Sequence, residues 1–511
     1  MSFPFRDTSP EAQREISLAR LLAFVRDVVS PYSPYYRRVL RERGVDVAGL
    51  RTYEDFRRAI PITTKADIVA HQAAFTVAPA YPGHPNPHGV EPLRPAHWAA
   101  YRAAAQTPGV RDVFGLRPEQ DRIREQYLRE WQPIHFQMSG GSTGRSITTG
   151  YTYRDLDLMA RSAAWWYELN RRIRPDDKWL NLLPAAPHLG IYAGLLVPLL
   201  TAQPNFNTFG GKAMPTERQI ELAAEDGNFA AIIALPSYLT HWLRTAGRML
   251  DSGRIKPLAG FRLTFCVGEP ITDSYRRLLK DLFRAVGAED VAVLEGMGST
   301  ELRSPGFYEC AEGSKLHFDP EYFFAEILHP QTREPVPWGE PGVLVWSHID
   351  WRGTVILRYW TGDYISGGMV WGTCPHCRLT IPRLVTPIWR AERDFTRIRG
   401  ARVEYVALQD AVRGVAGVQT YQIVIGTDDP AEAASRDRLD VTVAAAPGSD
   451  TVVLANAVRD AVKRQVEVLP DSVTVEPAAD IEARLFARKL KAEWIVDLRP
   501  PPAVAPDGAA T

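Results

Sequence analysis

Residues 139–145 read Ser-Gly-Gly-Ser-Thr-Gly-Arg, and this stretch bears on both the fold and its chemistry. Glycine allows a close backbone approach and positive φ angles, while serine and threonine supply hydroxyl groups. The backbone N–H groups of such a loop can surround phosphate oxygens. The G-x-x-x-x-G-K-[ST] spacing of the Walker loop is absent. Taken alone, the stretch fits a phosphate-binding loop and a flexible turn between two strands equally well.

Short apolar runs follow this loop, and most of them lead through a turn into a helical stretch. The alternation predicts an α/β fold with a mostly parallel sheet. The period-two alternation between residues 322 and 370 predicts an antiparallel portion, so the large domain combines helices with mixed sheets. The apolar runs are WLNLLPA (179–185), AAIIALP (230–236), FRLTFCVG (261–268) and VAVLEGMG (291–298).

The length of 511 residues allows about three domains at roughly 150 residues each, or one large and one small domain. Composition changes at about residue 389, where new strand and helix patterns begin. We therefore predict a large domain over 1–388, a small α+β domain over 389–498 and a disordered tail over 499–511. Residues 75–130 are expected to form an irregular insertion, because their first part is rich in Pro, Gly and His.

Charge and hydropathy exclude several function classes. Lys+Arg and Asp+Glu number 60 each, so the formal net charge is zero and a nucleic-acid footprint is not expected. No run reaches the roughly 18 apolar residues of a membrane span, and the N-terminus does not resemble a secretory signal. Four cysteines are too few for a disulfide framework. A cytoplasmic protein is the expectation.

Further motifs follow the glycine-rich loop in a fixed order: GEP at 268–270, GSTE at 298–301, YWTGD at 359–363, RDFTRIRGARVE at 393–404 and ARKLKAEWIVD at 487–497. Their order and spacing resemble the adenylate-forming superfamily of acyl-CoA synthetases, adenylation domains and luciferases. The stretches SPYYRRVL (33–40), ITTKADI (62–68) and FYECAEGSKLHFDPEYFFAEILHP (307–330) are similar to its phenylacetate-CoA ligase branch. The resemblance spans about residues 30–498 apart from 75–130.

The resemblance implies an ATP site with Mg²⁺. Thr300 matches the hydroxyl that contacts the α-phosphate, and Glu301 matches the acid that holds Mg²⁺; the plainer alternative for Glu301 is an acid at a helix N-terminus. Two residues depart from the family pattern, Arg145 where lysine is frequent and Met297 where an aromatic ring stacks on adenine. The implied nucleotide-binding residues are Ser139, Ser142, Thr143, Gly144, Arg145, Glu269, Met297 and Asp363.

The small domain carries the implied catalytic lysine. Lys491 matches the terminal K-x-x-x-V-x-D pattern of the family, and Lys489 is the rival two residues away. A lysine near the α-phosphate stabilises negative charge that develops during adenylation. The family rotates its small domain between adenylation and thioester formation, and the hinge falls here on Arg393 or Asp394.

Cysteine spacing predicts a metal site. Cys374 and Cys377 form a C-x-x-C pair, and Cys310 with His317 completes a Cys₃His set of the kind that holds structural zinc. Some members of the resembled branch carry such a site. The alternatives are His376 in place of His317, a redox pair, and unrelated thiols. The fourth cysteine, Cys266, lies in an apolar run and is expected to be core.

The resemblance places an acyl pocket at Tyr192, Ala193, Ser237 and Gly268, and its aromatic character favours an aryl or arylacetic acid. The predicted enzyme activates this small carboxylic acid with ATP and passes it to the thiol of CoA. One alternative passes the acyl group to an amine, another nitrogen nucleophile or a carrier-protein thiol in secondary metabolism. An alternative of another class is a non-catalytic nucleotide-binding homologue. A homodimer is expected from the family.

Overall fold

The computed structural model describes residues 8–81, 83, 85–86, 88–105, 118–139, 146–169, 173–174, 176–390, 395–399, 401–429, 435–487 and 492–499. The chain divides into two compact units. The first contains Met1–Pro236, Thr245–Glu269 and Phe283–Ile388, and the second contains Ser237–Arg244, Pro270–Leu282 and Trp389–Thr511. Each unit has a hydrophobic core of its own.

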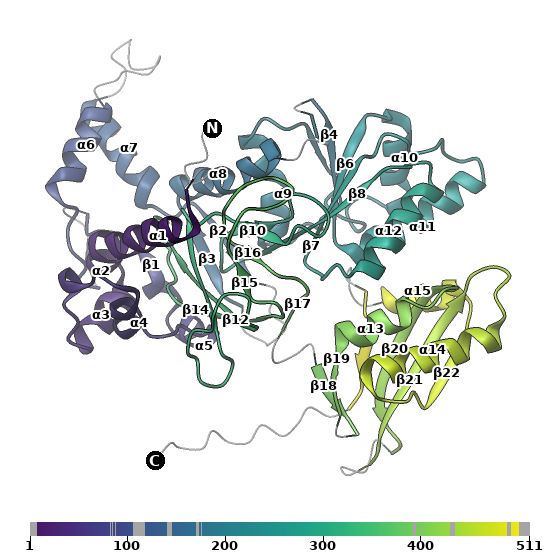
Figure 1. Cartoon of the computed structure of the whole chain (residues 1–511). Helices are drawn as coiled ribbons and strands as arrows, with labels where there is room; N and C mark the ends of the chain where they lie inside the picture. Colours follow the sequence, from purple (N-terminus) through teal and green to yellow (C-terminus); the bar gives the residue numbers. More distant parts are fainter. Residues whose placement is uncertain are drawn as a thin grey trace. The chain divides into compact units, whose positions relative to one another are not determined.

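A nine-stranded sheet forms the centre of the first unit (Figure 1). Its parallel part has the order β8-β7-β6-β4-β5, and β9 then pairs with β8 in the antiparallel sense and leads to β10, β16 and β15. The mixed sheet confirms the predicted fold class. The strands are β4 (Lys178–Asn181), β5 (Asn205–Asn207), β6 (Phe229–Ala234), β7 (Leu263–Val267), β8 (Ala292–Ser299), β9 (Ser304–Tyr308), β10 (Leu316–Phe318), β15 (Met369–Val370) and β16 (Arg383–Leu384).

Helices connect the parallel strands, because parallel neighbours require a crossover. The crossovers carry α9 (Leu189–Leu200), α10 (Thr216–Asp226), α11 (Pro236–Asp251) and α12 (Asp273–Ala285), and α8 (Tyr153–Leu169) precedes β4. Strands β6 and β7 are buried along almost their whole length, which explains their continuous apolar sequences. Cys266 of β7 is fully buried, as predicted for a core residue.

A second, antiparallel sheet occupies residues 323–390 of the chain and has the order β11-β12-β14-β17. This confirms the period-two prediction for that region. Two small ribbons accompany it, β1 with β13 and β2 with β3. The bounds are β11 (Phe323–Leu328), β12 (Gly342–His348), β14 (Tyr359–Ile365), β17 (Ile388–Arg390), β1 (Thr76–Val77), β13 (Gly353–Thr354), β2 (His135–Met138) and β3 (Thr148–Tyr151).

Helices dominate the N-terminal part of the first unit (Figure 1). The prediction that residues 75–130 are irregular is wrong for two stretches, because Pro95–Ala105 forms α6 and Glu119–Trp131 forms α7. Tyr101 and Trp131 anchor this helical pair in the core, which the Pro- and His-rich composition did not reveal. The remaining elements are α1 (Pro10–Phe24), η1 (Val25–Val29), α2 (Ser30–Tyr32), α3 (Pro34–Glu42), η2 (Val47–Gly49), α4 (Tyr53–Ala59), α5 (Lys65–Ala70) and η3 (Gln72–Phe75).

The second unit contains a four-stranded sheet of order β22-β21-β20-β23 with helices packed on it. Its α+β elements follow the predicted strand and helix runs after residue 389. They are β18 (Phe395–Ile398), β19 (Ala401–Glu404), α13 (Tyr405–Arg413), β20 (Val418–Thr427), β21 (Asp437–Ala445), α14 (Thr451–Val466), β22 (Ser472–Val475), α15 (Ala478–Leu485) and β23 (Ile495–Asp497). The predicted disordered tail lies outside the described residues, except for Arg499.

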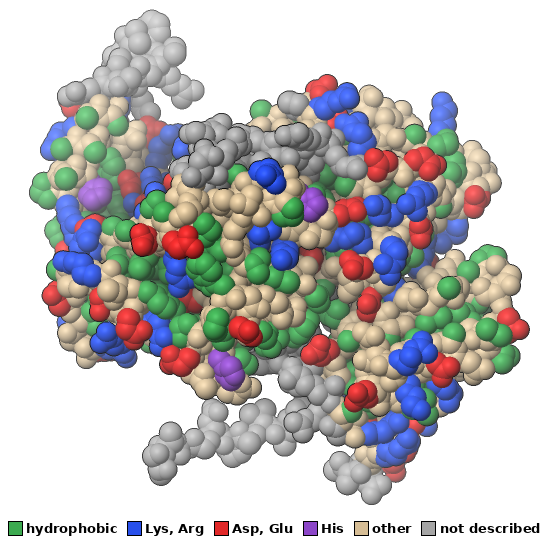
Figure 2. Space-filling model, viewed as in Figure 1, with side chains coloured by type: hydrophobic (Ala, Val, Ile, Leu, Met, Phe, Trp, Pro, Cys, Tyr) green, Lys and Arg blue, Asp and Glu red, His purple; other side chains and the backbone are tan. Residues whose placement is uncertain are grey.

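The surface carries both signs of charge. On the face that Figure 2 shows, basic and acidic side chains are interspersed, in keeping with the balanced composition. Within the part of the chain that the structure describes, no helix combines the length and apolarity needed to cross a membrane.

The packing of β7 against β8 yields a first prediction. A Cβ atom on Gly296 of β8 would lie 2.2 Å from Cζ of the Phe265 ring. We expect Gly296→Ala to lower the free energy of unfolding by about 1–3 kcal/mol, the usual cost of overpacking. Chemical denaturation would measure it. Gly426→Ala in β20 is the matched control, because nothing lies within 4 Å of its Cβ position. Equal effects of the two substitutions would contradict the packing argument.

Candidate functional site

Parallel pairing gathers several predicted site segments at one sheet edge. In the register, Ala234 of β6 pairs with Cys266 of β7, and Val267 pairs with Gly296 of β8. The segments that follow β4, β6, β7 and β8 therefore leave the sheet at the same carboxyl edge, where open α/β sheets bind ligands. These segments carry the predicted residues Tyr192 and Ala193, Gly268 and Glu269, and Thr300 and Glu301, and Met297 lies near the end of β8 itself.

Gly268 occupies a position that requires glycine. Its φ angle is +78°, and an added Cβ would lie 2.9 Å from Cδ2 of Leu235. The chain turns sharply there, directly after β7, before Glu269. Close approach of the backbone at a strand end is a common use of glycine in ligand sites.

Thr300 and Glu301 lie in a turn, residues 300–303, which joins β8 to β9. The alternative that Glu301 begins a helix is wrong, because antiparallel strand β9 follows the turn. Thr300, Leu302 and Arg303 are buried, whereas Glu301 is half-buried and reaches toward solvent. The turn thus presents one carboxylate outward from a buried base.

The glycine-rich stretch lies in the sequence between β2 and β3, which pair in the antiparallel sense. Ser139 closes the base of the loop: its N–H donates to the Ile147 carbonyl at 2.8 Å, and its Oγ accepts from the Ile147 N–H at 2.9 Å. The hairpin reaches the turn at Thr149, whose hydroxyl donates to the Thr300 carbonyl at 3.3 Å. The structure therefore brings the base of the glycine-rich loop and the Thr300 turn together.

The start of α9 joins these two elements. The N–H of Leu189 donates to the Thr300 hydroxyl oxygen at 3.4 Å. His188 caps α9, because its Nδ1 accepts from the Gly190 N–H at 3.3 Å. On the same helix, the Tyr192 ring meets the His135 ring of β2 edge to face, with centroids 4.1 Å apart. Burial lowers the pKa of both His135 and His188, so both imidazoles are neutral at pH 7.

Asp363 lies in β14, within a strand whose alternate side chains are buried. Its carboxylate is largely buried, and its N–H donates to the Thr361 hydroxyl at 2.9 Å. The strand is irregular beside it, because Gly362 has a φ angle of +76° and the register with β12 shifts between Val343 and Val345. The implied role of Asp363 in nucleotide binding remains a prediction.

Several predicted residues lie outside the described part of the chain. They are Ser142, Thr143, Gly144, Arg145, Arg393, Asp394, Lys489 and Lys491. Ser237 is described and belongs to the second unit: it is buried in α11, and its Oγ accepts from the Ala492 N–H of the same unit at 3.2 Å. Its predicted role in an acyl pocket remains a prediction.

The four predicted metal ligands converge at the other end of the nine-stranded sheet. The ligand atoms of Cys310, His317, Cys374 and Cys377 all lie within 4.8 Å of one another. Cys310 follows β9, His317 is in β10, and the C-x-x-C pair lies between β15 and β16. The alternative of unrelated thiols is therefore wrong for these cysteines. His376 is exposed and does not take the place of His317.

The histidine of this cluster has the tautomer that a metal requires. Nδ1 of His317 lies 3.2 Å from the Tyr308 carbonyl and 3.1 Å from the Lys315 carbonyl. Because both partners only accept, Nδ1 carries a proton, and Nε2, the nitrogen that could bind a metal, lies 3.5 Å from the Cys377 sulfur. A carbonyl behind the imidazole is the usual support of a metal-bound histidine. The donor set fits a closed tetrahedral zinc site.

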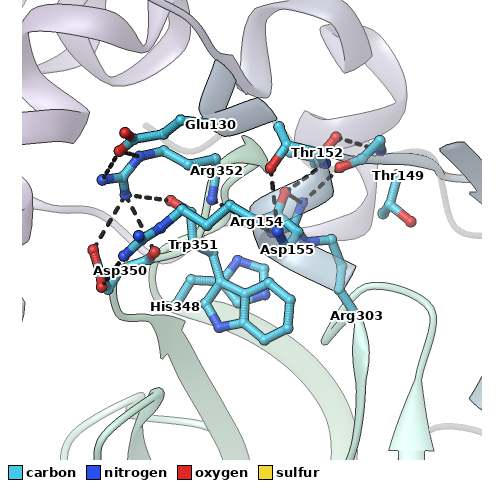
Figure 3. Close-up of polar contacts among 12 residues, drawn as sticks. Glu130, Thr149, Thr152, Arg154, Asp155, Arg303, His348, Asp350, Trp351 and Arg352 are labelled. Carbon is cyan, nitrogen blue, oxygen red and sulfur yellow. Dashed lines mark hydrogen bonds and ion pairs between the residues drawn. The ribbon is translucent and has the colours of Figure 1, made fainter. Parts of the chain in front are cut away.

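Sequence reasoning missed three residues that hold the 300–303 turn, namely Asp155, Arg303 and His348 (Figure 3). The sequence signal that could have indicated Arg303 was its position, two residues after Glu301. Thr152-x-x-Asp155 has the pattern of a capping box at the start of α8, so its sequence indicates only a helix start. Nothing in the local sequence marks His348.

His348 holds the turn in its neutral form. Ile356 donates its N–H to Nδ1 at 3.0 Å, so the proton is on Nε2, which donates to the Leu302 carbonyl at 3.1 Å. Burial, assisted by the nearby Arg303 charge, lowers the pKa of His348 well below its usual value. Protonation of Nδ1 would place a second donor against the Ile356 N–H, and this hydrogen bond would be lost.

Comparison with known proteins addresses the class of this site. Residues 72–360 match the model of a family described as AMP-binding enzyme. The chain belongs to the AMP-binding enzyme family. This confirms the predicted resemblance to adenylate-forming ligases and excludes a fold outside this class.

Curated relatives of this AMP-binding enzyme are ligases. It is 29% identical over 433 residues to a phenylacetate-coenzyme A ligase of Thermus thermophilus, covering 82% of this chain and 80% of the relative. It is 27% identical over 246 residues to a phenylacetate-coenzyme A ligase of Escherichia coli, covering 45% of this chain and 51% of the relative. The prediction of an AMP-forming ligase similar to that group is confirmed.

A solved structure shares the fold of the AMP-binding enzyme. The crystal structure of 2-hydroxyisobutyryl-CoA ligase in the postadenylation state superposes with a TM-score of 0.71 and 20% sequence identity. The match covers 97% of this chain and 91% of the other. At this identity the similarity establishes the fold.

The buried neutral His348 predicts a pH effect on the stability of this AMP-binding enzyme. Its folded pKa lies below the unfolded value of about 6.5, so its contribution is complete above that value and is lost as pH falls. We expect His348→Gln to flatten the fall in the free energy of unfolding between about pH 7.5 and about pH 5.5, measured by urea denaturation. The control His88→Gln changes an exposed histidine and should keep the wild-type slope. A wild-type slope in His348→Gln would refute the assignment.

Proposed function

We propose that this enzyme converts a carboxylic acid and ATP into an acyl-adenylate and pyrophosphate, and then transfers the acyl group to the thiol of CoA. The observation that supports it best is the junction of the Thr300–Glu301 turn with the base of the glycine-rich hairpin. This junction lies at the carboxyl edge of the parallel sheet, where ligands bind in open α/β folds. The phenylacetate-coenzyme A ligase relatives supply the class of acceptor and acid.

In the adenylation step a carboxylate oxygen attacks the α-phosphorus, and pyrophosphate leaves. The protein mainly positions the reactants and neutralises charge. We assign the β- and γ-phosphates to backbone N–H groups and hydroxyls of residues 139–145, and the α-phosphate to the Thr300 hydroxyl. Asp363 would accept hydrogen bonds from both ribose hydroxyls, and Met297 would cover the adenine beside Glu269.

Glu301 is the residue that would hold Mg²⁺. Its half-buried carboxylate is the outward-facing group of an otherwise buried turn, which suits a cation shared with phosphate oxygens. Bound there, Mg²⁺ would neutralise charge on the phosphates. The Glu301 carboxylate would fix the position of that positive charge relative to Thr300.

Residues 389–498 would act as a mobile domain that brings Lys491 to the α-phosphate. Lysine at that place stabilises the negative charge that grows on the phosphate oxygens as the carboxylate attacks. Arg393 or Asp394 would form the pivot for the following rotation to thioester formation. Lys489 is the nearest competitor for the role of Lys491.

The acid is proposed to be aryl or arylacetic. Tyr192 and His135 place two rings edge to face, and Ala193 follows Tyr192 on the same helix. Neutral His135 would offer an aromatic substrate an uncharged ring. The names of the curated relatives agree with this class.

Pyrophosphate release tests the proposal. Purified enzyme is mixed with Mg·ATP and a panel of benzoic, phenylacetic and short aliphatic acids, with and without CoA. We expect release with one aromatic class and, when CoA is present, faster turnover and acyl-CoA detected by mass spectrometry. If CoA leaves the turnover unchanged, the acyl acceptor would instead be an amine or a carrier-protein thiol. Absence of release with every acid would contradict it.

The lysine assignment has a matched pair of variants. Lys491→Ala is expected to lower kcat for acid-dependent pyrophosphate release by about 100-fold or more, because it removes charge stabilisation at the transition state. Lys489→Ala should retain kcat within about threefold. The reverse order would assign the catalytic role to Lys489.

We also propose that Cys310, His317, Cys374 and Cys377 hold one structural Zn²⁺. Three thiolates and one imidazole close the coordination sphere, so the ion would join β9, β10 and the 374–377 loop without an open position for substrate. The fixed tautomer of His317 supports this set.

Metal analysis of the purified protein is expected to give about one zinc per chain. Cys374→Ser and Cys377→Ser should lose the zinc and unfold at lower temperature, since metal binding contributes to folding. Cys266→Ala is the matched control, because Cys266 is buried in β7 away from the ligand set, and it should retain zinc. Zinc-free wild-type protein, prepared without chelators, would refute the site.

A further inference from the structure

A fully buried carboxylate lies beneath the turn that carries Thr300 and Glu301. Asp155 Oδ2 accepts from the Thr152 N–H at 2.8 Å, and Oδ1 accepts from the Arg352 N–H at 2.7 Å. The Arg303 guanidinium adds contacts of 3.2 Å to each oxygen. One carboxylate thus joins three chain segments that are distant in sequence (Figure 3).

Arg303 is the most deeply buried arginine of this cluster, with 0% of its side chain exposed. Besides Asp155, its Nη1 donates to the Gly150 carbonyl of β3 at 2.6 Å. The rings of Tyr151 and Trp351 lie 5.1 and 4.7 Å from its guanidinium carbon. Arg303 therefore fastens the end of the turn to the strand that leads out of the glycine-rich loop.

The backbone at Arg303 has a conformation that residues other than glycine rarely adopt. Its φ angle is +62°, in the left-handed region. Such a residue persists where its surroundings fix it, and the ion pair with Asp155 supplies that constraint. Glycine would adopt this angle without strain but would leave the turn without its attachment to β3.

The space around the pair is tightly filled. A Cβ on Gly353 would lie 2.3 Å from the Gly150 carbonyl oxygen and 3.0 Å from both Arg303 Nη1 and Asp155 Oδ2. The β13 backbone therefore approaches the pair as closely as glycine permits. This packing prevents the guanidinium from moving to another acceptor.

The pair differs from the more exposed ion pairs around it. Arg352 with Glu130, and Arg154 with Asp350, extend the cluster toward α7 and the surface, and Glu130 and Asp350 are partly exposed. Exposed pairs contribute little to stability, and a buried pair must overcome the loss of hydration of both ions. The buried pair of Arg303 and Asp155 is therefore better explained by the geometry that it fixes than by a contribution to stability.

We propose that Arg303 and Asp155 are positioning residues, which hold the 300–303 turn against β3 so that Thr300 and Glu301 meet the nucleotide phosphates held by the glycine-rich loop. This inference rests on the proposed function of that turn. Neither residue contacts the phosphates in this role. The pair fixes the separation between two phosphate-binding segments, 139–145 and 300–303, that are distant in the sequence.

Arginine is specific for this role. Its Nη1 donates to the Gly150 carbonyl and to Asp155 Oδ2, and its Nη2 lies 3.2 Å from Oδ1 in an ion pair, whereas lysine lacks the second nitrogen. Arg303→Lys retains the buried charge and loses the fork. Asp155→Asn retains the shape of the carboxylate and leaves the arginine without its counter-charge.

Equilibrium binding of Mg·ATP to the full chain, measured by titration calorimetry, tests the proposal. We expect Arg303→Lys and Asp155→Asn each to raise Kd by about tenfold or more, because the two phosphate-binding segments lose their fixed register. In pyrophosphate release, KM for ATP should rise and kcat should fall, while KM for the acid stays within about twofold. This split distinguishes positioning from a general loss of folded protein.

Glu326→Gln is the matched control. Glu326 forms a buried ion pair with Arg358, whose φ angle is also positive, at +46°, and Arg358 donates to carbonyls of Arg57 and Ile60 instead of β3. Glu326→Gln should lower the unfolding temperature, as Arg303→Lys and Asp155→Asn do. Its Kd for Mg·ATP should remain that of the wild type. Folding is verified by circular dichroism before each titration.

Each outcome decides the proposal. If wild type binds Mg·ATP and both test variants bind as Glu326→Gln does, the positioning role is wrong and the proposed function stands. If neither test variant folds while Glu326→Gln does, the pair serves folding, and the positioning role is again wrong. If wild type binds no Mg·ATP, the proposed function fails and this inference fails with it.

Discussion

The parallel pairing of β4, β6, β7 and β8 is the constraint on which the candidate site depends. Parallel strands end at the same edge, so each crossover delivers its next segment to one place. Gly268, Met297 and Thr300 gather there although dozens of residues separate the first from the last two. Antiparallel β9 then reverses the chain, and the short turn between β8 and β9 holds the half-buried Glu301 beside the buried residues Thr300 and Arg303.

Strand β9 connects two features that differ in chemistry. The 300–303 turn precedes it, and Cys310 of the cysteine–histidine cluster follows it. At the first end, Asp155, Thr149 and His348 contact buried polar groups of the turn; at the other, thiols and an imidazole face one another. Both arrangements fix loops that apolar packing alone would not hold, because loops carry backbone polar groups that must be paired when buried.

Local groups, rather than overall charge, must select an anionic ligand in this protein. The net charge is zero, and both signs are interspersed on the face shown in Figure 2, so a long-range field that attracts phosphates is not a feature of the composition. Backbone N–H groups, hydroxyls and one outward-facing carboxylate interact with a ligand only over short distances. They require accurate placement, which explains why buried contacts such as Arg303 to Gly150 surround them.

The sequence by itself determined the α/β class, the positions of the buried strands along the chain, the membership of the family and the four residues of the cysteine–histidine cluster. Apolar runs, glycine motifs and cysteine spacing are local signals, so they survive without knowledge of the fold. It failed for α6 and α7, because Pro- and His-rich composition at 75–98 masked helices anchored by Tyr101 and Trp131. Only the tertiary structure decided that Asp155, Arg303 and His348 support one turn, since their partners lie as many as 197 residues apart and hydrogen bonds across such separations leave no local pattern.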